Sequence, residues 1–391
     1  MKIKFTPPLL FITVLLGLDV VLDSNMEASA HNDYSVNTFE LPKDSSYYQI
    51  PNSDFETPWI NEHEPGNGWY GYASCKGEQS STRETAAEYT TKVKGHDSAS
   101  AAQLVSYDNW ISNMNSYLTT GCVNYDSFDS NEDKNYIFTD RKGDNHLLFA
   151  GVPDSITFYC KYIKSDKEKE YHGEFNLVIH GDIDYKYPFE SEENEKTYKI
   201  AGTNIAIAPS NDWIRYSSPI EYTNIKSDKV YLLATFSTSD KIGLTNNDTL
   251  TVDDIAFIYN SKLKKVIYDG SEIEINNGKA IVNAKYDESK LKLQSDGLGA
   301  LIKKEFDANT GILKISVIGN DISINPQNLH SYEILFEDHT STDVIKIIDS
   351  ISNVYDLQGR LILKDIHKSE ALRKLDNGVY IFGNEKIIID K

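Results

Sequence analysis

The chain has 391 residues, a length typical of two or three domains, and its 40% hydrophobic content excludes a disordered chain. The formal net charge of −20 argues against nucleic acid or anionic lipid as a partner, because binding either one requires clustered lysine and arginine. The same charge is compatible with neutral polysaccharides and with Ca²⁺.

The N-terminus has the pattern of a targeting signal. Lys2 and Lys4 precede an apolar stretch at residues 9–22, and Ala28-Ser29-Ala30 follows as a small-residue cleavage site. This pattern predicts a secretory signal peptide over residues 1–30, cleaved before His31. We therefore expect a secreted or surface-exposed protein, with a polar linker over residues 31–45.

Residues 46–261 have the pattern of a large β-domain. Apolar and polar residues alternate in Ser155–Tyr162, Glu174–His180 and Val230–Ser239, which is typical of strands that pack one face on a core. Gly-, Asn- and Asp-rich turns separate these windows, so they predict a jelly-roll β-sandwich. The alternation in residues 250–259 changes phase at Asp253-Asp254, which predicts a β-bulge that redirects one carboxylate.

The rest of the chain forms two further predicted modules. Residues 262–340 alternate in Ala280–Ala284, Ile312–Val317 and Tyr332–Phe336, and predict a small immunoglobulin-like β-sandwich. Residues 341–391 predict a C-terminal β unit of three short strands. The fold class is therefore all-β throughout.

Three cysteines allow at most one disulfide within the chain. Cys75, Cys122 and Cys160 have neither zinc-site nor redox-pair spacing. Cys160 lies in an alternating strand pattern, so we expect it to be a small buried hydrophobe. The pairing among the three remains open.

Sugar binding needs flat apolar rings beside hydrogen-bonding groups. Trp69, Tyr70 and Tyr72 fall in a Gly-rich loop that is expected to expose them, and Trp110 stands close to Asn113. These five residues are the predicted sugar-binding set, although each tryptophan could equally pack in a core.

Catalytic signals are weak. A glycosidase needs two facing carboxylates, but 59 acidic residues allow no pair to be selected. We find no His-Glu-x-x-His, Gly-x-Ser-x-Gly or phosphate-loop motif, so the sequence predicts no catalytic residue.

A series of short motifs, in order over two hundred residues, resembles the PCMD family, a carbohydrate-metabolism domain of bacterial surface proteins related to jelly-roll carbohydrate-binding modules. The motifs are Asn52-Ser53-Asp54-Phe55-Glu56 with Trp59, Gly68-Trp69-Tyr70, residues 95–104, Leu118-Thr119-Thr120-Gly121, residues 149–158, Trp213-Ile214-Arg215-Tyr216 and Val252-Asp253-Asp254-Ile255. The resemblance implies a carbohydrate or glycan as partner.

The same resemblance implies a structural Ca²⁺ that joins the first strand of the jelly roll to the last. Glu56 and either Asp253 or Asp254 match the ligand positions, and Asp54 is a weaker candidate that could only cap a turn. Carboxylate oxygens suit this hard cation.

The C-terminus resembles the sorting domain of the type 9 secretion system. Tyr355-Asp356-Leu357-Gln358-Gly359-Arg360 and Gly378-Val379-Tyr380-Ile381 carry the resemblance. It implies secretion or surface-anchoring machinery as a second partner.

Together these observations predict a secreted or surface-exposed carbohydrate-binding protein that takes part in glycan capture or utilisation. Two alternatives stay open: a glycoside hydrolase or lyase on the same scaffold, and a structural or adhesive surface protein. The sequence determines neither the glycan nor the oligomeric state.

Overall fold

The computed structural model describes residues 47–82, 86, 88–108, 113–129, 132–241, 247–337 and 351–389. Most of the regular structure in these residues is β-strand, so the protein is all-β, as predicted. None of the helices in these ranges is long and apolar enough to cross a membrane.

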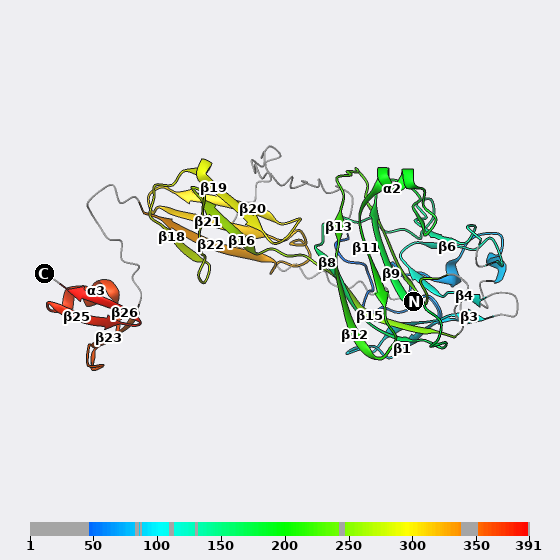
Figure 1. The fold of residues 1–391 in the computed structure, drawn as a ribbon, viewed down its shortest axis with the longest axis horizontal. Helices are drawn as coiled ribbons and strands as arrows, with labels where there is room; N and C mark the ends of the chain where they lie inside the picture. Colours follow the sequence, from blue (N-terminus) through cyan, green and yellow to red (C-terminus); the bar gives the residue numbers. More distant parts are fainter. Residues whose placement is uncertain are drawn as a thin grey trace, which may run out of the picture. The chain divides into compact units, whose positions relative to one another are not determined.

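Two five-stranded antiparallel sheets form a jelly-roll sandwich (Figure 1). The first sheet has the order β1 (Thr90–Val93), β2 (Ala101–Val105), β15 (Thr249–Ile258), β8 (Ser155–Ile163) and β12 (Ser210–Pro219). The second has the order β13 (Glu221–Tyr222), β11 (Lys199–Ile207), β9 (Gly173–His180), β14 (Tyr231–Ser237) and β5 (Tyr117–Thr119).

Alternating side chains of both sheets fill the core of the sandwich. Ile156, Phe158 and Cys160 of β8 lie in the same buried cluster as Phe175 and Leu177 of β9. Successive strand residues point to opposite faces, so the predicted two-residue period places these side chains between the sheets. Cys160 is 1% exposed and packs as the predicted small hydrophobe.

The outer face of the second sheet is partly covered, which the sequence pattern did not predict. A three-stranded sheet with the order β10 (Lys186–Tyr187), β7 (Tyr136–Phe138) and β6 (Cys122–Asn124) contributes to a second buried cluster with Val178 and Leu233. All seven residues of β14 are consequently buried. Alternation within one strand does not reveal such a covering layer on its second face.

Shorter elements complete the first sandwich. They are η1 (Tyr72–Ser74), η2 (Ser80–Thr82), the pair β3 (Tyr107–Asp108) and β4 (Asn113–Met114), and helix α2 (Glu192–Tyr198). Helix α2 begins after Ser191, whose side chain accepts a hydrogen bond from the Asn194 amide at 3.1 Å, a standard N-cap.

The predicted irregularity in β15 is present. The pairing of β15 with β8 shifts register between Asp253 and Ala256, and Asp254 adopts a φ of 52°. A positive φ is uncommon for a residue other than glycine but accessible to aspartate. The shift explains why the apolar pattern changes phase at this pair.

Residues 263–336 form two further sheets. One has the order β17 (Ser271–Glu272), β16 (Leu263–Tyr268) and β19 (Leu291–Ser295), and η3 (Glu288–Lys290) precedes its last strand. The other has the order β18 (Lys279–Val282), β22 (Leu329–Phe336), β21 (Ile312–Ile318) and β20 (Leu301–Asp307). Leu313, Ile315 and Val317 of β21 are fully buried. The module boundaries proposed from the sequence stay predictions.

The C-terminal segment contains more structure than the three predicted strands. Its antiparallel sheet has the order β24 (Leu361–His367), β23 (Ile351–Asp356), β25 (Gly378–Phe382) and β26 (Glu385–Ile389), with helix α3 (Lys368–Lys374) between β24 and β25. Ala371 of the helix is buried with Val354 and Phe382 of the strands. The charged stretch between the two sorting-like motifs therefore forms a strand and a helix.

Candidate functional site

A cavity of about 110 Å³ lies where the three-stranded sheet meets the outer face of the second large sheet. Five tyrosines contribute to its walls: Tyr72, Tyr117, Tyr125, Tyr136 and Tyr187. Two acidic residues, Glu174 and Asp240, also line it. Flat rings and hydrogen-bonding groups therefore share one small cavity.

Strand register brings part of the cavity together. Ser237 of β14 pairs with Glu174 of β9 on one side and with Tyr117 of β5 on the other. Paired residues in antiparallel strands point to the same face. The three side chains therefore form a row across the outer face, while the adjacent Phe175 and Phe236 point into the core.

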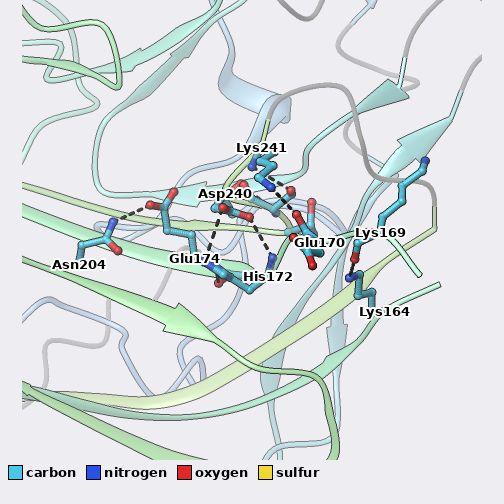
Figure 2. A network of polar contacts seen from close by, with 12 residues as sticks. Lys164, Lys169, Glu170, His172, Glu174, Asn204, Asp240 and Lys241 are labelled. Carbon is cyan, nitrogen blue, oxygen red and sulfur yellow. Dashed lines mark hydrogen bonds and ion pairs between the residues drawn. The ribbon is translucent and has the colours of Figure 1, made fainter. Parts of the chain in front are cut away.

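Glu174 is held by two neighbouring elements, and Figure 2 shows its contact with Asn204. The Tyr187 hydroxyl donates to Glu174 Oε2 at 2.7 Å, and Asn204 Nδ2 donates to Oε1 at 2.5 Å. These hydrogen bonds connect β9 to β10 and β11. They fix the orientation of the carboxyl group, and each of its oxygens still has capacity to accept another hydrogen bond.

Asp240 follows β14 and is held by His172, which precedes β9 (Figure 2). The His172 amide donates to Asp240 Oδ1 at 2.9 Å, and His172 Nε2 lies 3.5 Å from Oδ2. The Asp240 amide in turn donates to the His172 carbonyl at 2.9 Å. The reciprocal contacts position this second carboxyl group at the cavity.

Burial and the acidic neighbours raise the pKa values of Tyr117 and Tyr187. Burial raises the pKa of Tyr117 to about 12, and the negative charge of Glu174 contributes to that rise. Burial also raises the pKa of Tyr187, and Glu174 and Asp240 both add to this effect. Tyr117 and Tyr187 are therefore neutral rings with hydroxyl groups at physiological pH.

Trp69 cannot serve as the exposed sugar platform expected from its Gly-rich loop. It is 0% exposed, its ring packs against Phe55 and Phe236 at centroid distances of 6.1 and 6.0 Å, and its Nε1 donates to Ser53 Oγ. Gly66 and Gly68 adopt φ values of 66° and 102°, which glycine adopts readily. These turns carry the tryptophan into the core instead of out to solvent.

The other predicted sugar-binding residues have different positions. Tyr72 is only 5% exposed and contributes to the cavity wall, with its hydroxyl donating to the Asn115 carbonyl at 3.1 Å. Tyr70 is half-buried outside this cavity, and its hydroxyl reaches the Asp144 carbonyl at 3.3 Å. Trp110 and the side chain of Asn113 lie outside the described residues.

Two of the predicted calcium ligands converge on the loop of residues 95–100. Asp253 is 0% exposed, and its Oδ2 accepts hydrogen bonds from the His96 amide and the Ser98 hydroxyl, both at 2.8 Å. Glu56 Oε1 accepts from the Ser100 amide at 2.6 Å. The donor set is oxygen-rich and suits Ca²⁺ chemically, with backbone carbonyls or water needed to complete it.

The remaining two candidates contribute less. Asp54 is exposed and caps a turn by accepting from the Glu56 amide at 3.2 Å. Asp254 Oδ2 lies 3.6 Å from His96 Nδ1. Within the described ranges, no group of three or more His, Cys, Asp or Glu residues is arranged to hold a metal ion, so calcium binding stays a prediction.

Sequence reasoning missed Tyr117, Glu174, Tyr187 and Asp240 as site residues. A signal was available for Glu174, because it begins the polar face of the alternating window at 174–180. Nothing in the local pattern indicated that Tyr187 would fold back over that face.

Comparison with known proteins gives fold likenesses only. No protein-family model and no curated protein matches the chain. A proposed glycoside hydrolase of Bacteroides thetaiotaomicron is 13% identical, with 58% of this chain and 71% of that chain covered, at a TM-score of 0.39. TmCBM61, solved with β-1,4-galactotriose, is 10% identical, with 54% and 97% covered, at a TM-score of 0.26. Likenesses this distant assign no activity, and membership of the PCMD family stays a prediction.

Proposed function

We propose that the jelly-roll sandwich binds carbohydrate in the cavity between the three-stranded sheet and the outer face of the second large sheet. The observation that carries the proposal is the lining itself, in which five tyrosines surround Glu174 and Asp240. Aromatic faces pack against the C–H surface of a sugar, and fixed polar groups accept hydrogen bonds from its hydroxyls.

The size of the cavity supports recognition of one sugar unit. At about 110 Å³ it is well below the roughly 300–1,000 Å³ of pockets that enclose drug-sized ligands. A single monosaccharide at the end or branch of a glycan suits this space better than an internal oligosaccharide segment.

The test compares two half-buried tyrosines on opposite faces of the sandwich. Purified full-length protein is screened on a glycan array, and the glycans bound are measured by calorimetry. We expect Tyr136→Ala to weaken binding about tenfold or more, a loss of about 1.4 kcal/mol, because Tyr136 lines the cavity. Tyr159→Ala is the matched control, since Tyr159 stacks on His96 on the first sheet.

Two results would count against the proposal. One is the absence of binding to any glycan on the array. The other is a loss caused by Tyr159→Ala and not by Tyr136→Ala, which would move the site to the opposite face.

A second candidate function is glycoside hydrolysis. The observation that favours it is the presence of two acidic residues, Glu174 and Asp240, in one cavity, since glycosidases use paired carboxyl groups. Product analysis of the bound glycans after incubation separates the two functions, because a binding module returns them intact. If the protein has a structural or adhesive role without glycan recognition, we expect no binding to any glycan on the array.

Export and sorting are part of the same proposal. The predicted signal peptide of residues 1–30 lies outside the described residues. The sorting-like resemblance of the C-terminal unit supports surface delivery, and a glycan-capturing role is consistent with that location.

A further inference from the structure

The hydrogen-bond donors around the cavity are largely used by the protein itself. Three asparagines line it, and all six of their amide N–H bonds point to protein oxygens at 2.8–3.3 Å. The donors are Nδ2 of Asn115, Asn124 and Asn135. An asparagine amide has only two N–H bonds, so these three have none to offer a ligand.

Three hydroxyls of the lining also donate to the protein. The Tyr72 hydroxyl donates to the Asn115 carbonyl at 3.1 Å, and the Tyr187 hydroxyl to Glu174 at 2.7 Å. The Ser237 hydroxyl donates to the Ser239 carbonyl at 2.7 Å. Each of these oxygens keeps the ability to accept.

The carboxyl groups add to this acceptor surplus. Glu174 accepts a hydrogen bond from Tyr187 at one oxygen and from Asn204 at the other, and Asp240 accepts from the His172 amide. A carboxylate can accept about four hydrogen bonds in all. Glu174 and Asp240 therefore favour a ligand that supplies hydrogen-bond donors.

The charge of the cavity lining also disfavours an anionic ligand. Among the described residues that line the cavity, two are acidic and none is lysine, arginine or histidine. Outside the lining, Lys186 Nζ lies 4.4 Å from the centre of the Tyr136 ring, and His172 Nε2 lies 3.5 Å from Asp240 Oδ2. A negatively charged ligand close to the Glu174 and Asp240 carboxylates is repelled by them, and the repulsion is stronger where water is excluded.

We infer that the cavity selects neutral, hydroxyl-rich sugar residues and rejects sugars that carry a carboxylate or a sulfate at the bound unit. The inference deepens the proposed function and rests on it. Neutral sugars supply O–H donors to Glu174 and Asp240. Carboxylate and sulfate groups only accept hydrogen bonds, so they would offer no donor to the half-buried Glu174 and Asp240 and would place like charges together.

The experiment uses sugars of matched shape and different charge. Calorimetry on the full chain compares a neutral oligosaccharide, the same oligosaccharide with a uronate at the bound unit, and the methyl ester of that uronate. We expect the uronate to bind at least about tenfold more weakly than the neutral sugar. Esterification should recover much of the loss, because it removes the charge and retains the carbonyl group.

Variants show whether the two carboxyl groups cause the discrimination. Glu174→Gln and Asp240→Asn should each reduce the ratio between neutral sugar and uronate, even where they weaken neutral binding. Asp212→Asn removes the same charge from an exposed position on β12 of the other large sheet. The ratio should not change in this control.

The outcomes are distinct. If uronates or sulfated sugars bind as well as neutral ones, the selectivity inference is wrong and carbohydrate binding stands. If Asp212→Asn changes the ratio as much as the cavity variants, overall charge is the cause and the inference again fails. If no glycan of either kind binds, the proposed function itself fails.

Discussion

At the scale of single residues, His180 and Glu64 are buried groups whose pKa values are shifted in opposite directions. His180 is 0% exposed and bonds to the Thr139 hydroxyl at 2.7 Å and the Gly181 carbonyl at 2.8 Å. Burial lowers the pKa of His180 to about 4, and the nearby Arg141 charge adds to the effect. Glu64 is 3% exposed, and burial raises the pKa of its carboxyl to about 7.

The two shifts have opposite consequences for stability. Between pH 4 and 6.5 the unfolded chain binds the His180 proton more tightly than the folded chain does. The contribution of His180 to the free energy of unfolding is therefore complete above about pH 6.5 and is lost toward pH 4. Between pH 4.5 and 7 the folded chain binds the Glu64 proton more tightly. The Glu64 contribution is therefore complete below pH 4.5 and is lost as pH rises through 7.

We predict that the two contributions nearly cancel in the intact protein and that single variants separate them. From about pH 7.5 to about pH 5, each is worth on the order of 2 kcal/mol. Relative to the wild type, His180→Gln should gain stability on acidification and Glu64→Gln should lose it. Urea unfolding at the two pH values measures the difference. The same pH response in all three proteins would contradict the assignment.

At the scale of elements, β15 and the loop of residues 95–100 bring distant parts of the sandwich together. The bulge in β15 lets the buried Asp253 accept hydrogen bonds from this loop, and Glu56 reaches the same loop at Ser100. Glu56 and Asp253 are almost two hundred residues apart, so closing this connection costs chain entropy. A cation held by both would bind only the folded state and stabilise it.

We therefore predict that Ca²⁺ raises the melting temperature and that a chelator lowers it. At 100 times the dissociation constant the stabilisation is about 2.7 kcal/mol, or roughly 5–10 °C for a domain of this size. Glu56→Gln and Asp253→Asn should weaken the response, measured by calorimetric melting. Asp54→Asn is the control, because Asp54 is exposed and caps a local turn.

A melting temperature that changes with neither chelator nor Ca²⁺ would mean that no bound cation stabilises this fold. The hydrogen bonds of Asp253 to the His96 amide and the Ser98 hydroxyl would then connect β15 to the loop without a metal ion.

At the scale of the whole molecule, the C-terminal unit has a buried core of its own. Val354, Ile366 and Ala371 belong to a cluster that includes Leu375 and Phe382. The sorting-like segment Asp356–Arg360 forms a tight turn, in which Asp356 accepts from the Gln358 and Arg360 amides. Gly359 has a φ of 79° in that turn, a conformation that favours glycine.

We predict that deleting residues 345–391 blocks surface delivery and leaves the jelly roll folded. Cell fractionation should find the truncated protein retained in the periplasm, while its glycan binding is unchanged. A protein with Gly359→Val tests the turn alone, since a β-branched residue is strained at this φ. Normal surface display after the deletion would mean that the unit is structural and takes no part in sorting.

The sequence by itself determined the strand character of the chain and much of its core. In Ser155–Tyr162 the two-residue period identified which side chains of β8 face inward, because a strand alternates faces whatever its partners are. The phase change at Asp253-Asp254 likewise indicated the irregularity in β15, since a register shift must reverse the alternation. Both are local properties, set by neighbouring residues along the chain.

Only the tertiary structure decided which polar and aromatic groups meet in a site. Trp69 and Tyr187 both lie in turn-rich segments, yet the first enters the core and the second bonds to Glu174. Tyr117, Glu174 and Ser237 form one row because strands far apart in the sequence are neighbours in the sheet. The physical reason is that exposure depends on what covers a strand, and here the cover comes from β6, β7 and β10, whose placement no local pattern records.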